Sequence, residues 1–258
     1  MKILYAFSLR HWLCLWGFLV CAGGAPVSAG TTQAPLPVAC EAQDTACLFG
    51  LLGEAGAAIA EPVWRDQTYR ETAKLLAYDG RAEEALALLP LIGNPDTQAM
   101  TLRGIGVALA GTTIPDSDKQ ALYGRLVAAG AGIVQPESRA IALRYVAKGQ
   151  ALAGFDDSAR ATIRKIDNLS QSDKAFEEVA EVQAKAERLD QALLSIADIR
   201  SPAYRDRAHG AVSKICAGRG LYPQALRAAE KIENPYNRGQ ALLTILEGQI
   251  LAGEQEAP

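Results

Sequence analysis

Apolar positions recur along this chain with a long, regular spacing. Isoleucine returns at a constant interval at Ile133, Ile166, Ile199 and Ile232, and the same interval separates Ile59 from Ile92. This interval, about 33 residues, lies in the range typical of repeat architectures. Inside each period the apolar residues follow helical spacing, and one register consists of Ile105, Val146, Val179, Val212 and Ile245. Since no segment shows the sustained alternation of a strand, the pattern predicts a repeated helical unit.

A proline marks the start of a helix in nearly every period. It stands three residues after the isoleucine, at Pro62, Pro95, Pro136, Pro202 and Pro235, and Leu169 is the exception. The residue before this position is Glu61, Asn94, Gln135, Asn168, Ser201 or Asn234. Asn and Ser side chains accept from an unpaired backbone N–H, and proline at the first helical position lacks an N–H that would be unpaired anyway. We therefore expect a first helix to begin here, with weaker caps at Glu61 and Gln135.

A glycine marks the end of this first helix. It keeps a constant distance from the isoleucine, at Gly80, Gly154, Gly220 and Gly253, where a left-handed backbone costs little. Glu187 takes this place in one period, so that turn must close in another way. A second helix then runs to the next isoleucine, with small residues at one position: Ala85, Ala159, Ala192 and Ala225. Each period is thus predicted to hold a helix of about 18 residues, a glycine turn and a helix of about 11.

One period is longer than the others. The interval from Ile92 to Ile133 exceeds the common one by eight positions, and this surplus fits the loop Gly111–Ser117, either as a contact loop or as a tolerated surface excursion. The prediction is then a lone helix over 45–59, five helical pairs, and a last helix from Pro235 to Gly253. A single pair cannot bury its apolar stripe, whereas stacked pairs form a continuous core. We expect one all-α domain over 45–258, with the terminal helices as caps.

This arrangement resembles the tetratricopeptide repeat family. The likeness rests on the helix-turn-helix period close to 34, the small residues of the second helix, and the proline near each repeat boundary, and it covers residues 45–253. It implies a right-handed superhelix of about five 33-residue helical hairpins, whose concave face binds peptides or partner proteins. The family's Trp, Leu-Gly and Tyr series is not reproduced in each repeat, so related α-solenoids remain open.

The first 29 residues have the pattern of a secretory signal peptide. Lys2 and Arg10 are followed by an apolar run from Trp12 to Ala22 and by the small residues Val27-Ser28-Ala29. The alternative is an uncleaved N-terminal anchor. Residues 30–44, with Pro35 and Pro37, read as a flexible lead-in to the domain. A cleaved signal predicts a periplasmic or secreted protein.

The net charge of the chain limits the classes of partner that we expect it to bind. The chain has 26 basic and 29 acidic residues, and loss of Lys2 and Arg10 leaves 24 basic residues and a net charge of −5. Nucleic acids and anionic membranes need a basic surface, so we expect neither as a partner, and no further apolar stretch predicts membrane insertion after cleavage. We expect a protein or peptide partner instead.

Three cysteines remain after cleavage. On a single helix Cys40 and Cys47 would lie too far apart to bond, but Asp44-Thr45 looks like a helix start. Cys40 then lies in the preceding loop, and a disulfide between Cys40 and Cys47 is expected in an oxidising compartment. Cys216 is interpreted as a small buried apolar residue.

The sequence offers little for catalysis. The mature chain has one histidine, His209, at a register position where other repeats carry Tyr69, Leu102, Leu143, Phe176 and Leu242, so we expect it to be packed. No nucleophile, zinc or phosphate-loop motif occurs, and Gly104 and Gly106 are assigned to close helix packing. We predict no enzyme activity, no metal site and no cofactor.

Arginine recurs at two register positions of the first helix. The first arginine series is Arg65, Arg139, Arg205 and Arg238, with Gln98 and Ser172 in the other two repeats; the second is Arg70, Arg103 and Arg144. Each arginine could bond a neighbouring repeat, or the guanidinium groups could line the concave wall and bind carboxylates or carbonyls of a partner. The predicted function is a non-catalytic scaffold for protein or peptide binding. The alternative is a structural subunit of a cell-envelope assembly, such as polysaccharide-export or cell-wall machinery.

Overall fold

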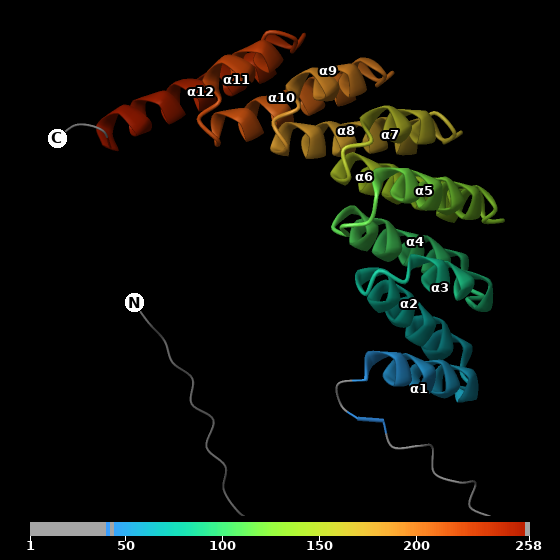
Figure 1. Ribbon diagram of the computed structural model, residues 1–258. Helices are drawn as coiled ribbons and strands as arrows, with labels where there is room; N and C mark the ends of the chain where they lie inside the picture. Colours follow the sequence, from blue (N-terminus) through green and yellow to red (C-terminus); the bar gives the residue numbers. More distant parts are fainter. Residues whose placement is uncertain (1–39, 42–43, 256–258) are drawn as a thin grey trace, which may run out of the picture. The chain divides into compact units, whose positions relative to one another are not determined.

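The computed structural model describes residues 40–41 and 44–255, so the expected signal peptide and most of the lead-in lie outside the described residues. Every regular element in the described part is a helix (Figure 1). The elements are α1 Thr45–Ala58, α2 Pro62–Tyr78, α3 Ala82–Ala87, the 3₁₀ turn Leu89–Leu91, α4 Pro95–Ala110, α5 Asp116–Ala131, α6 Pro136–Leu152, α7 Asp156–Ile163, α8 Leu169–Lys185, α9 Leu189–Ala197, α10 Pro202–Ala217, α11 Tyr222–Ala229 and α12 Pro235–Gln255. The predicted all-α class is confirmed.

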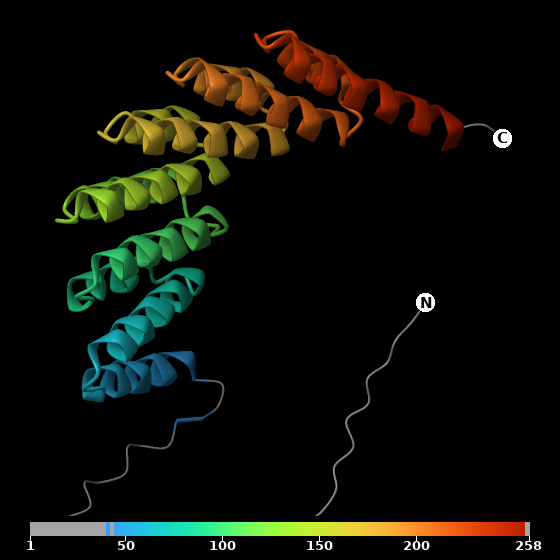
Figure 2. The ribbon, with the colours of Figure 1, turned by 180° about the vertical axis from the view of Figure 1, so that it is seen from behind.

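The helices of residues 45–255 stack in chain order (Figures 1 and 2). Each first helix, from α2 to α12 by even numbers, packs against the next first helix in the chain. The second helices α3, α7, α9 and α11 pack mainly on the first helix of their own pair and less on the one that follows, whereas α5 packs more on α6 than on α4. Successive second helices hardly touch. The contacts therefore join helices that are close together in chain order.

Of the four Asn and Ser residues that precede first helices, three cap the helix with their side chains as predicted. Asn94, Asn168 and Asn234 accept from backbone N–H groups three residues on, at 2.9, 3.0 and 3.1 Å. Ser201 makes no such bond, so its prediction as a side-chain cap was wrong. Glu61 and Gln135 make none either, as their weaker capping tendency suggested.

Four first helices end in the same hydrogen-bonded turn. The glycine at this point has a positive φ in three of them, 80° at Gly80, 87° at Gly154 and 72° at Gly220. In α10 the N–H of Leu221 donates to Cys216 O at 2.9 Å and that of Gly220 to Ala217 O at 3.0 Å, which is the Schellman arrangement. Glu187 adopts φ 62° in the equivalent turn, so it closes this helix with the same backbone geometry but at a steric cost.

Two boundaries differ from the prediction. Gly253 does not end the last helix, because α12 continues to Gln255. The eight surplus residues are not mainly a loop: only 111–115 are non-helical, and α5 runs over 16 residues where the other second helices have 6 to 9. Asp116 and Asp118 in the first turn of α5 favour a helix there, because carboxylates stabilise its positive end.

The repeated apolar residues form the core. Ile92, Ile133, Ile166, Ile199 and Ile232 are all buried where one pair joins the next, and Ala85, Ala159, Ala192 and Ala225 are fully buried between the two helices of a pair. The core falls into two clusters, one over α2–α6 and one over α6–α12. The isoleucine and alanine series are therefore explained by packing.

Replacing Glu187 with glycine should stabilise the protein by about 0.5–1 kcal/mol. The substitution removes the steric cost of a side chain at φ 62°. It also removes an exposed ion pair with Arg219, which contributes little. The measurement is the urea midpoint of Glu187→Gly. A midpoint at or below that of the unaltered protein would show that Glu187 is not strained.

Candidate binding surface

The members of the first arginine series have different neighbours in the structure. The Arg205 guanidinium donates to Ile199 O at 3.1 Å and Arg200 O at 3.2 Å, and lies 3.5 Å from the Glu233 carboxylate. Gln98, at the same register position, donates to Ile92 O at 2.7 Å. In these two repeats the side chain at this position therefore bonds a backbone carbonyl just after the preceding second helix.

The other members of this series differ from Arg205. Arg65 Nε lies 3.9 Å from Asp66 Oδ1. Arg139 lines a hollow of about 470 Å³ between α6 and α8, together with Lys165 and Gln171. Arg238 is exposed on α12. A series that is regular in sequence thus has several different local roles.

The second arginine series is brought together on three adjoining helices. Arg70 lies on α2, Arg103 on α4 and Arg144 on α6, and these helices pack side by side. The guanidinium carbons of Arg103 and Arg144 lie 4.9 and 5.0 Å from the ring centroid of Tyr145. A guanidinium close to an aromatic face is attracted to it, so Tyr145 holds both groups in place.

Arg70 and Arg103 share a hollow of about 340 Å³ between α2 and α4. Its apolar lining comes from Tyr78, Met100 and Val107. The hollow therefore places positive charge next to an apolar surface. An acidic side chain flanked by an apolar one has the complementary chemistry.

Charge on this face is unevenly compensated. Arg70 Nε donates to Glu71 at 2.9 Å, and Lys74 pairs with the same carboxylate; this bond from Lys74 is the main cause that lowers the pKa of Glu71. Arg144 and Lys148 lie 3.8 and 3.7 Å from Glu178. Arg103 has no ion pair in the described part of the chain. We call Arg70, Lys74, Arg103, Arg144 and Lys148 the basic row; five cations face two carboxylates, although the whole chain has net charge −3.

The basic row stops at α8. Glu177 occupies the register position of the second arginine series there and forms a two-bond ion pair with Arg207 of α10. The Arg207 guanidinium also lies 4.2 Å from the ring centroid of Tyr204, and its pKa is raised chiefly by the bond to Glu177. In this part of the face, Glu177 and Arg207 therefore neutralise each other. Sequence reasoning missed the pair, although Glu177 in an arginine register was a visible signal.

A second polar cluster was also missed. Asp156 accepts from Gln183 Nε2 at 3.0 Å and from Arg188 Nε at 2.9 Å, and Ser195 donates to Gln183 Oε1 at 2.8 Å. Gln183 is fully buried between α8 and α9. Every polar side chain named here has a partner within the cluster, so its role is to join three helices.

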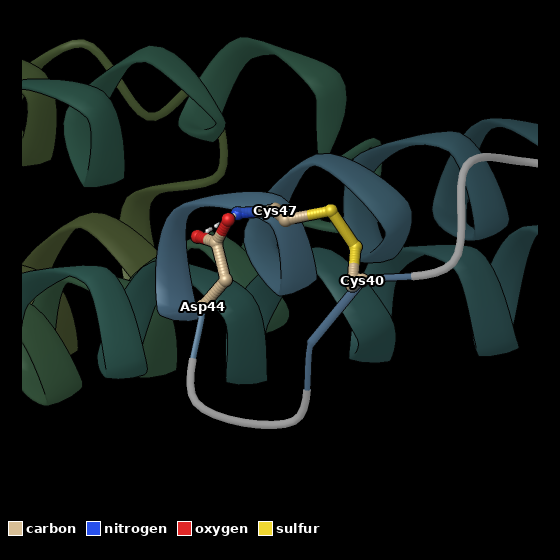
Figure 3. Close-up of a disulfide and its surroundings, with 3 residues drawn as sticks. All are labelled: Cys40, Asp44 and Cys47. Carbon is tan, nitrogen blue, oxygen red and sulfur yellow. Dashed lines mark hydrogen bonds between the residues drawn. A yellow bond between two sulfur atoms is a disulfide. The ribbon is translucent and has the colours of Figure 1, made fainter.

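The cysteines lie as expected. Cys40 and Cys47 are bonded across a Cα–Cα distance of 5.8 Å, and Asp44 caps α1 by accepting from Cys47 N at 2.9 Å (Figure 3). Cys40 precedes α1 and Cys47 lies in its first turn, so the bond joins the segment before the helix to the helix itself. Cys216 is free and buried, and burial raises the pKa of its thiol.

His209 is packed in the core, as predicted. Burial lowers its pKa, and this effect exceeds the opposing effect of the Asp206 carboxylate. The other charged groups around it are Lys231, Arg205 and Glu233. Its Nδ1 atom is buried and has no partner among the described residues. Across those residues no cluster of three or more His, Cys, Asp or Glu side chains could hold a metal ion.

His209→Leu should remove a pH dependence of stability. Because the folded-state pKa of His209 lies below its ordinary 6.5, protons bind the unfolded chain preferentially as pH falls through that value. The free energy of unfolding of the unaltered protein therefore falls as the pH decreases towards the lower folded-state pKa. Leucine fits the site, since Leu102 and Leu143 occupy it in other repeats. In urea unfolding at pH 7.5 and 5.5, the free energy of unfolding of the variant should rise relative to that of the unaltered protein at the lower pH. The same difference between the two proteins at both pH values would contradict the argument.

None of the helices in the described residues has the length and apolar character needed to cross a membrane.

Comparisons with known proteins give one weak likeness. No known protein family and no curated protein matches the chain. Among solved structures it is similar to Ton1535 from Thermococcus onnurineus NA1, with 14% sequence identity, coverage of 78% of this chain and 84% of that one, and a TM-score of 0.26.

Proposed function

We propose that this protein is an exported, non-catalytic scaffold of tetratricopeptide-like helical pairs, arranged as a right-handed superhelix. The stacked pairs with common Pro and Gly boundaries support the architecture. The disulfide between Cys40 and Cys47 favours an oxidising compartment, periplasmic or extracellular, in agreement with the pattern of residues 1–29.

The basic row is the proposed binding surface. Its ligand is an extended peptide or protein segment that carries acidic side chains beside apolar ones. The observation that carries this proposal is Arg103, which lies beside Tyr145, lines the hollow with Tyr78, Met100 and Val107, and has no carboxylate partner in the part of the chain that the structure describes. A guanidinium held in this way offers paired N–H donors to a carboxylate.

The test uses ten-residue peptides that differ only in acidic content, with binding followed by fluorescence anisotropy. Peptides containing Asp or Glu next to Leu or Phe should bind, and binding should weaken with added salt. Arg103→Gln should weaken it about tenfold, which is the expected loss of one charged hydrogen bond. The melting temperature should change little, because Arg103 makes no ion pair with any residue that the structure describes.

The matched control is Arg227→Gln. Arg227 lies on α11, away from the basic row, and bonds Asp190 at 2.7 Å. Its loss should leave peptide binding unchanged. Equal affinity of Arg103→Gln and the unaltered protein, or a preference for basic peptides, would reject the basic row as the binding surface.

The second candidate is a structural subunit of a cell-envelope assembly. It is favoured by the exposed apolar side chains of α12, which include Leu243, Leu246 and Leu251. Mass spectrometry of material captured by the mature protein from periplasmic extract separates the two candidates. A fixed stoichiometric complex supports the subunit, and release by acidic peptides supports the scaffold.

A further inference from the structure

Each end of the helical row is one half of a helical pair. At one end, α12 has the register of a first helix, and no described residue takes the place of its second helix. At the other end, α1 has the register of a second helix and packs on α2, the first helix that follows it. No described residue therefore covers the surfaces of α12 and α1 that inner helices bury within their own pair.

The open surface of α12 consists of large apolar side chains. Leu246 occupies the register position at which the inner repeats carry the buried small residues Ala73, Gly106, Ala147, Ala180 and Ser213. Leu246 is 53% and Ile250 54% exposed. With Leu226 and Leu242, Leu246 lines a hollow of about 740 Å³ between α11 and α12. We call Leu226, Leu242, Leu246 and Ile250 the α12 face.

Helix α1 has an open apolar surface of its own. Leu52 stands seven residues before Ile59, the position held in the other second helices by Ala85, Leu126, Ala159, Ala192 and Ala225, all fully buried. Leu52 is 36% exposed, and Leu48 one turn earlier is also exposed. Helix α1 contains a single charged residue, Glu54. We call Leu48, Leu52 and Ala55 the α1 face.

These two positions face each other in a complete pair. A Cβ atom at Gly106 on α4 would lie 4.0 Å from Cδ1 of Leu126 on α5. Gly106 has the register of Leu246, and Leu126 has the register of Leu52. In every inner pair at least one partner is Gly, Ala or Ser, whereas Leu246 and Leu52 are both large. Two helices in contact there would lie towards the upper end of the usual spacing of about 8–10 Å.

We propose that the α12 face of one molecule binds the α1 face of a second copy, which completes a sixth helical pair between the two chains. This contact continues the interface that already joins the two helices of each inner pair. A repeat stack that ended at these helices would need polar outer surfaces for solubility, and both end faces are apolar instead. The contact is heterologous, so it leaves one α1 face and one α12 face free and allows chains to grow. It is independent of the basic row.

Sedimentation velocity of the purified protein from about 1 to 200 µM is the first test, in a range typical of weak interfaces. The average mass should rise with concentration and pass that of a dimer. Leu246→Glu and Leu52→Glu, each at an exposed site and checked for an unchanged melting temperature, should both be monomeric alone. An equimolar mixture of the two variants should form dimers and nothing larger, because only one intact α12 face and one intact α1 face can then meet.

Three outcomes would overturn the proposal. Dimers of Leu52→Glu alone would indicate that two α12 faces meet. A monomer at every concentration would show that the α12 face and the α1 face do not bind each other. Unchanged association of both variants would place the contact elsewhere. As controls, Leu194→Glu on α9, equally exposed, and Arg103→Gln should both associate like the unaltered protein.

Discussion

Asp173→Ala is expected to lower the free energy of unfolding by about 3 kcal/mol. The Asp173 carboxylate is 1% exposed and accepts from Arg200 N at 2.9 Å and Ser201 N at 3.0 Å, across the boundary between two repeats. Alanine removes both charged hydrogen bonds and leaves two N–H groups at the start of α10 without their partner. The measurement is urea unfolding followed by circular dichroism.

The same bond recurs at other boundaries. Asp206 accepts from Glu233 N and Asn234 N, both at 2.8 Å, and Asp66 accepts from Asn94 N at 2.8 Å. Asp206→Ala should therefore cost a similar amount. Asp190→Ala is the control: this side chain is exposed and pairs with Arg227, so the change should stay within about 0.5 kcal/mol. Equal effects of Asp173→Ala and Asp190→Ala would show that these boundary bonds contribute little.

The starts and most of the glycine-marked ends of the first helices were predictable, because both depend on local chemistry. Proline at the first helical position and glycine at a positive φ act through the backbone of their own turn, so spacing alone located them. The lengths of the second helices were not predictable in this way. The spacing predicts about 11 residues for each of them, whereas α3 has 6 residues and α5 has 16.

The boundary aspartates were visible in the sequence but not interpreted. Asp173 and Asp206 are one period apart and share a register with Asp66, yet Ala99 and Ala140 occupy it elsewhere. An irregular series of this kind looks like a solvated face. Its meaning depends on a contact 27 or 28 residues away, and only the packing of one repeat on the next reveals which backbone N–H groups lie there.

The arginine series show the same limit for the candidate site. Register places Arg70, Arg103 and Arg144 on adjoining helices, and the structure agrees. Register does not distinguish Arg144, which is buried and lies 3.8 Å from Glu178, from Arg103, which lies beside a tyrosine and lines an open hollow. Which arginine is available to a ligand is decided by neighbours in other repeats, and these vary while the spacing stays constant.

Gly149→Ala is expected to destabilise the protein by about 2–3 kcal/mol. A Cβ atom at Gly149 would lie 2.9 Å from Gly106 O and 3.2 Å from Cε1 of Tyr123. The first of these neighbours is helix backbone, so α6 would have to move away from α4. Tyr123 Oη lies 2.7 Å from Gly106 O and 2.8 Å from Gly149 O, and this shared hydrogen bond would be lost with the movement.

Tyr and Gly occur together at this contact for a physical reason. Tyr222 and Gly248 have the registers of Tyr123 and Gly149, and Tyr222 Oη donates to Gly248 O at 2.8 Å. A phenol that reaches a helix carbonyl needs a glycine there, because any side chain would block the approach. Gly124→Ala is the control: nothing lies within 4 Å of the added Cβ, and alanine favours the helix by up to about 1 kcal/mol. Opposite signs for the two substitutions in urea unfolding are the expected result; two stabilising substitutions would show that α4 and α6 can separate without cost.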